Sequence, residues 1–279
     1  MFVTGSSTGL GLMTGQLLAE QGHAVVLHGR DEQRSDEVLR ALPDAEGAVT
    51  GDLSTICGMR SVAEQANALG RFDAVIHNAG VGYREAKRNE TEDGVPLVFA
   101  VNVLAPYVLT ALIERPDRLV YVSSGMHHGA DANLDDLLWT RRRWAGSTAY
   151  AESKLLDVLL AFAAARRWPD VVSTALEPGW VPTRMGGAGA RDDMDQAHRT
   201  QAWLAVSDDD GMRKTGAGGT GAGAAGAGAA GAGETGAGAT GEYFFHLRPK
   251  APNPQARDGK LQDGLIEACE RISSVRWPT

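Results

Sequence analysis

The chain has 279 residues, of which 43% are hydrophobic, so it can bury the core of one large domain or of two small ones. Its formal net charge of −8 leaves no basic excess for neutralising the phosphates of a nucleic acid. No stretch reaches the ~18 apolar residues that a membrane span needs, and the start lacks the basic and apolar regions of a signal peptide. Cys57 and Cys269 form no recognisable disulfide or metal-ligand pattern. We therefore expect a soluble, cytoplasmic protein.

Short apolar runs alternate with helical patterns in the first part of the chain. The apolar runs predict strands at residues 1–4, 24–28, 48–50 and 72–77. Helices are predicted after the glycines at 5–11, from Asp31, and up to about Leu69. The first strand is short for a central parallel strand, so we expect the natural start to lie upstream of Met1.

The alternation continues to the end of the chain. It predicts helices at about 96–112, 150–168, 195–205 and 258–273, and strands at 118–122, 171–177 and 242–246. Strands that alternate with helices form parallel βαβ units. The sequence therefore predicts an α/β fold: a single Rossmann-type, doubly wound parallel sheet of about seven strands with helices on both faces, spanning residues 1–279 as one domain.

Residues 215–241 are of low complexity, almost wholly Gly and Ala with a few Thr. Such a segment has few side chains to bury and much backbone entropy to lose, so we expect a disordered loop inserted before the last strand. A collagen helix is excluded, because the glycines do not keep a period of three and the segment has no proline.

Gly5, Gly9 and Gly11 form a glycine-rich turn between the first strand and the first helix. Glycines let the backbone approach a pyrophosphate closely, and the free N–H groups and the dipole at a helix N-terminus favour an anion. The spacing is Gly-x-x-x-Gly-x-Gly rather than Gly-x-Gly-x-x-Gly. At the start of a βαβ pattern, the turn indicates a dinucleotide.

Arg30 follows the second strand, where the adenosine ribose is expected. A guanidinium suits a 2′-phosphate, whereas a carboxylate suits a free 2′-hydroxyl. Asp31 is the competing candidate, because it lies about twenty residues after Gly11, but it also suits the N-cap of the next helix. We expect Arg30 rather than Asp31 to contact the 2′ position of the ribose, and therefore NADP(H) rather than NAD(H) as the preferred cofactor.

Tyr150 and Lys154 are four residues apart, so on a helix they lie on one face. A phenol ordinarily ionises near pH ~10, and a neighbouring ammonium favours the phenolate. The pair is therefore a candidate general acid or base, although many surface helices carry the same spacing by chance. Other residues in the chain support a catalytic role for the pair. Further polar and turn residues follow predicted strands, where open α/β sheets bind ligands. These are Asn78-Ala79-Gly80, Ser123-Ser124 and Pro178-Gly179, with Asn102 in a helix.

In their order along the chain, these motifs resemble those of the short-chain dehydrogenase/reductase family. The match runs through nearly the whole chain except residues 215–241. The resemblance implies a nicotinamide cofactor, with Asp52 at the adenine, Asn78 lining the cleft and Thr183 at the nicotinamide carboxamide. The cofactor-binding residues expected from the motifs and the resemblance are Gly5, Ser7, Thr8, Gly9, Leu10, Arg30, Asp52, Leu53, Asn78, Ala79, Gly80, Tyr150, Lys154, Pro178, Gly179, Val181 and Thr183.

The family resemblance also implies a catalytic set of Asn102, Ser124, Tyr150 and Lys154. Hydride passes between the nicotinamide and a carbonyl or alcohol, which the cofactor's chemistry permits. Tyr150 is then the acid or base, Ser124 hydrogen-bonds the substrate oxygen, Lys154 favours the phenolate and holds the ribose, and Asn102 positions a water that relays protons.

Two departures from the family pattern qualify these expectations. His77 stands where the family more often has Asn, and Ser124 and Tyr150 are 26 residues apart, about double the usual interval. The longer loop and the tail from Tyr243 resemble the retinol-dehydrogenase and carbonyl-reductase branch. The loop also interferes with the helix pairing of many family tetramers, so a monomer and a homodimer both remain open. No metal site is expected, because the adjacent pair His127-His128 has no evident third ligand.

The substrate is expected to be a small molecule, a medium-sized aldehyde or ketone or the matching alcohol, with a lipid or polyketide-like carbonyl left open. Trp139, Trp144, Trp180 and Met185 indicate an apolar pocket, although core packing would select similar residues. One rival is a catalytically idle NADP(H) sensor or scaffold, which has no need of the catalytic set. A second is a sugar-nucleotide epimerase or dehydratase, whose Gly-x-x-Gly-x-x-Gly turn is not seen.

Overall fold

A computed structural model of the protein describes residues 1–207 and 240–279. Its strands form one sheet in the order β3-β2-β1-β4-β5-β6-β7-β8, in which each neighbouring pair is parallel except β7 and β8. The strands are β1 (Phe2–Val3), β2 (Val26–Gly29), β3 (Gly47–Thr50), β4 (Ala74–His77), β5 (Arg118–Val122), β6 (Val172–Glu177), β7 (Glu242–Phe245) and β8 (Arg248–Pro249). This arrangement confirms the predicted doubly wound sheet, with one more strand than expected.

Helices connect the strands and cover both faces of the sheet. They are α1 (Gly9–Glu20), α2 (Glu32–Ala41), α3 (Ile56–Ala68), α4 (Leu97–Phe99), α5 (Ala105–Leu112), α6 (Gly146–Arg167), α7 (Met194–Val206) and α8 (Gly259–Ser273). Short 3₁₀ turns are η2 (Gly125–Gly129), η3 (Leu134–Asp136) and η5 (Pro254–Arg257). Each boundary lies close to the range that the sequence predicts, except at 96–112. There a π-helical turn, η1 (Ala100–Leu104), separates α4 from α5.

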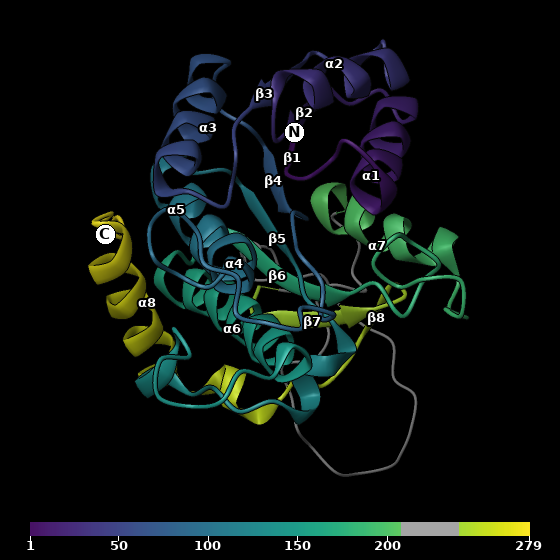
Figure 1. The fold of residues 1–279 in the computed structure, drawn as a ribbon. Coiled ribbons are helices and arrows are strands. Elements are labelled where there is room, and N and C mark those ends of the chain that lie inside the picture. Colours follow the sequence, from purple (N-terminus) through teal and green to yellow (C-terminus); the bar gives the residue numbers. More distant parts are fainter. Residues whose placement is uncertain (208–239) are drawn as a thin grey trace, which may run out of the picture.

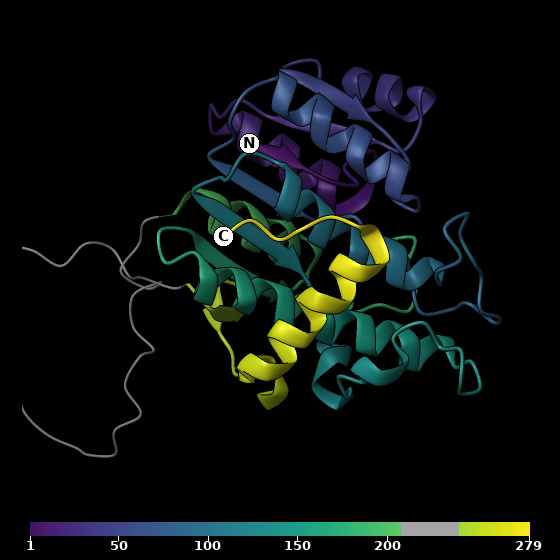
Figure 2. The same ribbon diagram turned by 90° about the vertical axis from the view of Figure 1, so that its left-hand side faces the viewer.

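Two layers of helices enclose the sheet (Figure 1). On one face α1, α2 and α7 bury Leu18, Val38 and Leu204 against the strands. On the other face α3, α5 and α6 form the larger core, and α8 packs on the outer side of α6 (Figure 2). Parallel strands buried on both faces need continuous apolar runs, which explains why the runs at β4 and β5 were visible in the sequence.

Acidic and hydroxyl side chains begin several helices. Asp31 accepts a hydrogen bond from the Arg34 N–H at the start of α2, and Thr55 accepts one from the Gly58 N–H at the start of α3. These caps satisfy N–H groups that the first helical turn leaves unpaired. The cap confirms the alternative interpretation of Asp31 as an N-cap.

The order of the strands places a ligand site between β1 and β4. The chain winds from β1 outward to β3 and then returns to β4 on the other side of β1, so the connections leave the sheet in opposite directions. A crevice opens at such a switch point, beyond the carboxyl ends of the strands. The Gly/Ala-rich loop predicted at 215–241 lies outside the described residues up to residue 239. No helix in residues 1–207 and 240–279 is long and apolar enough to cross a membrane.

Candidate active site

A cleft with a volume of about 1130 Å³ lies at the carboxyl ends of β1, β2 and β4 to β6. It brings together every cofactor-binding residue expected from the sequence and three of the four expected catalytic residues. Those lining it are Gly5, Ser7, Thr8, Gly9, Leu10, Arg30, Asp52, Leu53, Asn78, Ala79, Gly80, Ser124, Tyr150, Lys154, Pro178, Gly179, Val181 and Thr183. Asn102 is the exception and lies behind the cleft wall.

The glycine turn is held open by its contact with the end of β4. Gly5 has a φ of +60°, and a Cβ on it would lie 2.7 Å from the Ala79 Cα. The Asn78 side-chain amide donates to the Thr4 and Gly5 carbonyls, at 2.9 and 3.1 Å. Gly9 has a φ of +63° and no atom within 4 Å of its Cβ position. Only glycine adopts this backbone without strain and leaves the space above the turn free.

The N-terminus of α1 points into the same space. Thr8 is its N-cap but makes no side-chain capping bond, and Thr8, Gly9 and Leu10 all line the cleft. The first N–H groups of a helix need an acceptor, and the helix dipole favours a negative one. An open glycine turn followed by an uncapped helix start therefore fits the pyrophosphate of a dinucleotide.

His28 supports this turn from β2, a role that sequence reasoning missed. Its Nδ1 accepts the Gly5 N–H at 2.9 Å, and its Nε2 lies 2.9 Å from the Gly51 carbonyl. Burial lowers the pKa of His28, so the ring is neutral, with Nδ1 as acceptor and Nε2–H as donor. The position of His28 next to Gly29, at the end of a predicted strand, was the only indication of this role in the sequence. The glycine turn that His28 contacts is distant in sequence, so the contact itself could not be predicted.

Two arginines line the cleft near the start of α2. Arg30 is 71% exposed, and its Nε lies 3.2 Å from Asp31 Oδ2. Arg34 also lines the cleft and pairs with Glu37 at 2.6 Å. Sequence reasoning missed Arg34, although Arg34 lies in the first turn of α2. Each of the two guanidinium groups therefore has a neighbouring carboxylate.

Tyr150 and Lys154 lie on one face of α6, as the spacing predicts. The Tyr150 hydroxyl contacts Met185 Sδ at 3.7 Å, and its ring packs against Tyr83 with 5.7 Å between centroids. Lys154 Nζ lies 5.9 Å from the Tyr150 ring centroid. The same ammonium donates to the Val122 carbonyl at 2.8 Å and to Asp157 Oδ2 at 2.7 Å. Sequence reasoning did not find Asp157.

The two serines at the end of β5 have different surroundings. Ser123 is buried and donates to the Lys154 carbonyl at 2.7 Å, which ties β5 to α6. The Ser124 oxygen accepts the Met126 N–H at 3.3 Å, so its hydroxyl can still donate into the cleft. Ser124 is therefore the serine that can contact a substrate oxygen.

Asn102 holds the wall behind the cleft from the π-helical turn. Its Oδ1 accepts the Val81 N–H at 2.8 Å, and its Nδ2 donates to Ser153 Oγ at 2.9 Å. A Cβ on Gly80 would lie 3.5 Å from Asn102 Oδ1 and 3.7 Å from Lys154 Nζ. The space beside Gly80 is therefore bordered by both the amide and the ammonium.

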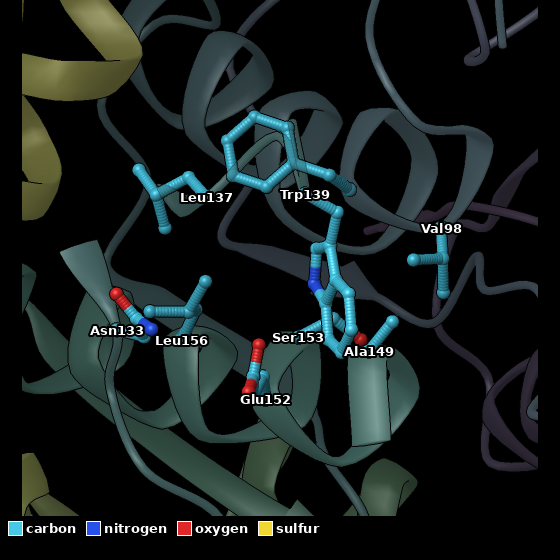
Figure 3. A pocket seen from close by; sticks show the side chains of 9 residues that line it. Val98, Asn133, Leu137, Trp139, Ala149, Glu152, Ser153 and Leu156 are labelled. Atoms are coloured by element: carbon cyan, nitrogen blue, oxygen red, sulfur yellow. The ribbon is translucent and has the colours of Figure 1, made fainter. Parts of the chain in front are cut away.

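The apolar residues expected in the substrate pocket, three tryptophans and one methionine, divide into two groups. Trp180 and Met185 line the cleft, but Trp139 and Trp144 do not, so the expectation is wrong for those two. Trp139 packs behind Tyr150 in an apolar cluster with Trp144 and is covered by the Arg142 guanidinium, 3.7 Å from its ring centroid. It lines a separate cavity of about 10 Å³ together with Leu137, Glu152 and Leu156 (Figure 3).

Of the histidine pair in the long loop, His127 is buried and His128 is exposed. The His127 Nδ1 lies 2.8 Å from the Ser124 carbonyl, and its Nε2 accepts the Asn253 N–H at 3.1 Å. Burial lowers the pKa of His127 to about 4. Across the described residues, no three His, Cys, Asp or Glu side chains group as a metal site.

The protein resembles known oxidoreductases along its whole length. Residues 1–126 match the family model described as short chain dehydrogenase. An uncharacterized oxidoreductase of Emericella nidulans, AN7799, is 38% identical and covers 100% of this chain and 98% of its own. A putative daunorubicin C-13 ketoreductase of a Streptomyces species, DnrU, is 34% identical over 67% of both chains. A blue fluorescent protein from a metagenomic library, solved in complex with NADPH, shares the fold, with a TM-score of 0.61, 23% identity and coverage of 74% of this chain and 90% of its own.

Proposed function

The chain belongs to the short-chain dehydrogenase/reductase family and is an oxidoreductase, and on that premise we propose that it interconverts a carbonyl compound and its alcohol with NADP(H), using Tyr150 as acid and base. One observation carries the proposal. The glycine turn, the uncapped start of α1, Ser124, Tyr150 and Lys154 all line one cleft of a single sheet. We further propose that residues 1–279 form one domain around that sheet.

The glycine turn and the start of α1 would hold the pyrophosphate, and the residues after β4 and β6 would hold the nicotinamide half. When bound, the dinucleotide supplies or accepts the hydride. Arg30 and Arg34 favour NADP(H), because a phosphate monoester binds guanidinium groups and both arginines line this cleft. Asp31 is occupied as the cap of α2 and as the partner of Arg30.

Residues of the chain donate and accept the proton in this reaction. In the reducing direction Tyr150 donates its hydroxyl proton to the oxygen that gains charge, and in the oxidising direction it takes the proton back. The Ser124 hydroxyl donates a hydrogen bond to the same oxygen and stabilises the developing charge. Lys154 has one N–H left after its bonds to Val122 and Asp157, and this N–H is available to the cofactor ribose.

Asn102 is the fourth member of the proposed set, and its contacts suggest a positioning role. It fixes Val81 on the cleft wall and Ser153 on α6, one residue before Lys154. A proton relay from Lys154 to Asn102 would cross the space beside Gly80, which the ammonium and the amide both border. We propose that a water fills this gap and completes the relay.

The substrate end of the cleft is apolar. Met185 contacts the Tyr150 hydroxyl, and Tyr83 packs against the Tyr150 ring. Trp180 lines the cleft with half of its surface exposed. Such a lining favours a medium-sized apolar aldehyde or ketone. The ketoreductase name of DnrU agrees with a ketone.

The test is the Tyr150→Phe variant, assayed for NADPH consumption with a panel of apolar aldehydes and ketones. We expect turnover to fall by at least about 100-fold, because the proton donor is lost, while the thermal shift produced by NADPH is retained. Tyr83→Phe is the matched control, since it removes a phenol from the same cleft without removing the proposed acid. A Tyr150→Phe enzyme with normal turnover would refute the assignment. NADPH binding without turnover in the wild-type protein would favour the idle-sensor alternative.

A further inference from the structure

Asp157 lies one helical turn after Lys154 on α6 and forms a buried ion pair with it. The Lys154 Nζ to Asp157 Oδ2 distance is 2.7 Å, and the two side chains are only 5% and 3% exposed. Lys154 reaches the cleft, whereas Asp157 does not line it. The carboxylate therefore acts on the site only through the lysine.

The ion pair fixes how the ammonium is presented. An ammonium has three N–H bonds in a tetrahedral arrangement. Asp157 and the Val122 carbonyl each accept one of them, at 2.7 and 2.8 Å. The direction of the remaining N–H is thereby set by two acceptors on different elements, α6 and β5.

The other titratable groups around the pair come from five elements. Tyr150 lies on α6 itself, Tyr121 lies on β5 and is hydrogen-bonded to Thr110 at 2.7 Å, and His77 lies on β4 against the Tyr121 ring. Burial raises the pKa of Tyr121 and lowers that of His77 to about 3, so both are neutral. Glu177 on β6 and Tyr243 on β7 lie toward Tyr150, and Glu177 pairs with Lys250.

Asp157 thus supplies the negative charge that directly faces Lys154 in this buried region. Burial alone would lower the pKa of Lys154, but the neighbouring carboxylate raises it above its ordinary value. The lysine is therefore charged at neutral pH and its field is partly cancelled by Asp157. An uncompensated ammonium in a buried site would favour the Tyr150 phenolate more strongly.

We propose that Asp157 is a positioning residue that orients Lys154 and offsets its charge, and thereby keeps Tyr150 in the protonated form that can donate to a carbonyl oxygen. This inference rests on the proposed function, in which Tyr150 carries the proton. Under this proposal, Asp157 favours the protonated Tyr150 that the reducing direction uses near neutral pH. The lysine alone would move the tyrosine toward the base that oxidation needs.

The Asp157→Asn variant tests this charge effect without substrate or cofactor. Asparagine keeps the size of the side chain and an oxygen that can accept from Lys154, but removes the negative charge. The ionisation of Tyr150 is followed by the ultraviolet absorbance of the phenolate as a function of pH. Subtracting the titration of the matching Tyr150→Phe protein isolates Tyr150 from the other four tyrosines. We expect the midpoint to fall by about one pH unit in Asp157→Asn.

Asp136→Asn is the matched control, because Asp136 is also buried and ion-paired but does not line the cleft. The midpoint should stay at its wild-type value in this control, and Asp157→Glu, which restores the carboxylate, should bring it back. If Asp157→Asn does not fold, Asp157→Ser removes the same charge with a smaller side chain and should give the same shift. An unchanged or raised midpoint in the folded variant overturns the proposal. Because the readout is the ionisation itself, an inactive wild-type protein would refute the proposed function and leave this test standing.

Discussion

Replacing Arg30 tests the proposed preference for NADP(H) over NAD(H). A fully formed hydrogen bond between charged groups contributes about 1.5–3 kcal/mol. The Arg30 side chain is 71% exposed and already contacts Asp31, so solvent screening and that competing partner reduce its share to about 1 kcal/mol. Arg30→Ala should therefore weaken NADPH binding roughly fivefold and leave NADH binding unchanged.

Arg34 is expected to contribute to NADPH binding in the same way as Arg30. Its side chain is 32% exposed, so it is screened less than Arg30, although Glu37 competes for it. The double variant Arg30→Ala/Arg34→Ala should weaken NADPH binding roughly 30-fold, if each arginine contributes about 1 kcal/mol. Both losses should shrink as salt is added, because exposed charges are screened.

The assay is fluorescence titration with NADPH and NADH at low and high ionic strength. Arg40→Ala is the matched control, because Arg40 lies on the same helix but does not line the cleft. Equal losses for NADPH and NADH in Arg30→Ala would refute the role of Arg30. A selective loss of NADH binding in Asp31→Ala would instead assign the ribose to Asp31.

Two further variants test the interior and the substrate end. His77 is buried and its pKa is lowered to about 3, so its unfolded form takes up a proton below pH 6.5 that the folded form excludes. Stability from this histidine is present above pH 6.5 and is lost as the pH falls, by about 3 kcal/mol at pH 4.5. His77→Asn should remove that part of the acid sensitivity in denaturant titrations at pH 7.5 and 4.5, and an unchanged difference between the two pH values would contradict the assignment. Met185 contacts the Tyr150 hydroxyl and lies against Gly82, so Met185→Ala should raise kcat/KM for bulky ketones relative to small ones by about 10-fold, with NADPH binding unchanged. An equal change for both substrates would show that Met185 does not shape the pocket.

The sheet could be predicted because its strands are buried on both faces and read as apolar runs. β8 could not, since Arg248 and Pro249 are exposed and form an edge strand defined only by its pairing with β7. The π-helical turn at 100–104 could not be predicted from the sequence either. Its extra residue is stabilised by the bonds that Asn102 makes to Val81 and Ser153, which lie 21 and 51 residues away.

Most of the site residues that could be predicted lie just after strands, where the topology alone brings them to one edge. Tyr150 and Lys154 lie within α6 and could be predicted from their spacing on one helix. Those that were missed reach the site through tertiary contacts. Asp157 faces Lys154 across one helical turn, but the sequence cannot show that this face of α6 is buried. Trp139 was misplaced for a related reason, because the Arg142 guanidinium and the Tyr150 helix enclose its ring behind the site.

The long interval between Ser124 and Tyr150 makes the substrate side of the cleft depend on the C-terminal part of the chain. η2 begins directly after Ser124, and the ring of His127 within it bridges the Ser124 carbonyl and the Asn253 N–H. The Asn253 side chain then donates to the Ala130 carbonyl at 2.9 Å, which closes the loop onto the tail. The glycine turn, by contrast, is held by contacts within residues 4–79. The proposed cofactor and substrate ends of the cleft therefore rest on separate parts of the chain, so the loop and tail can change with the substrate while the glycine turn stays the same.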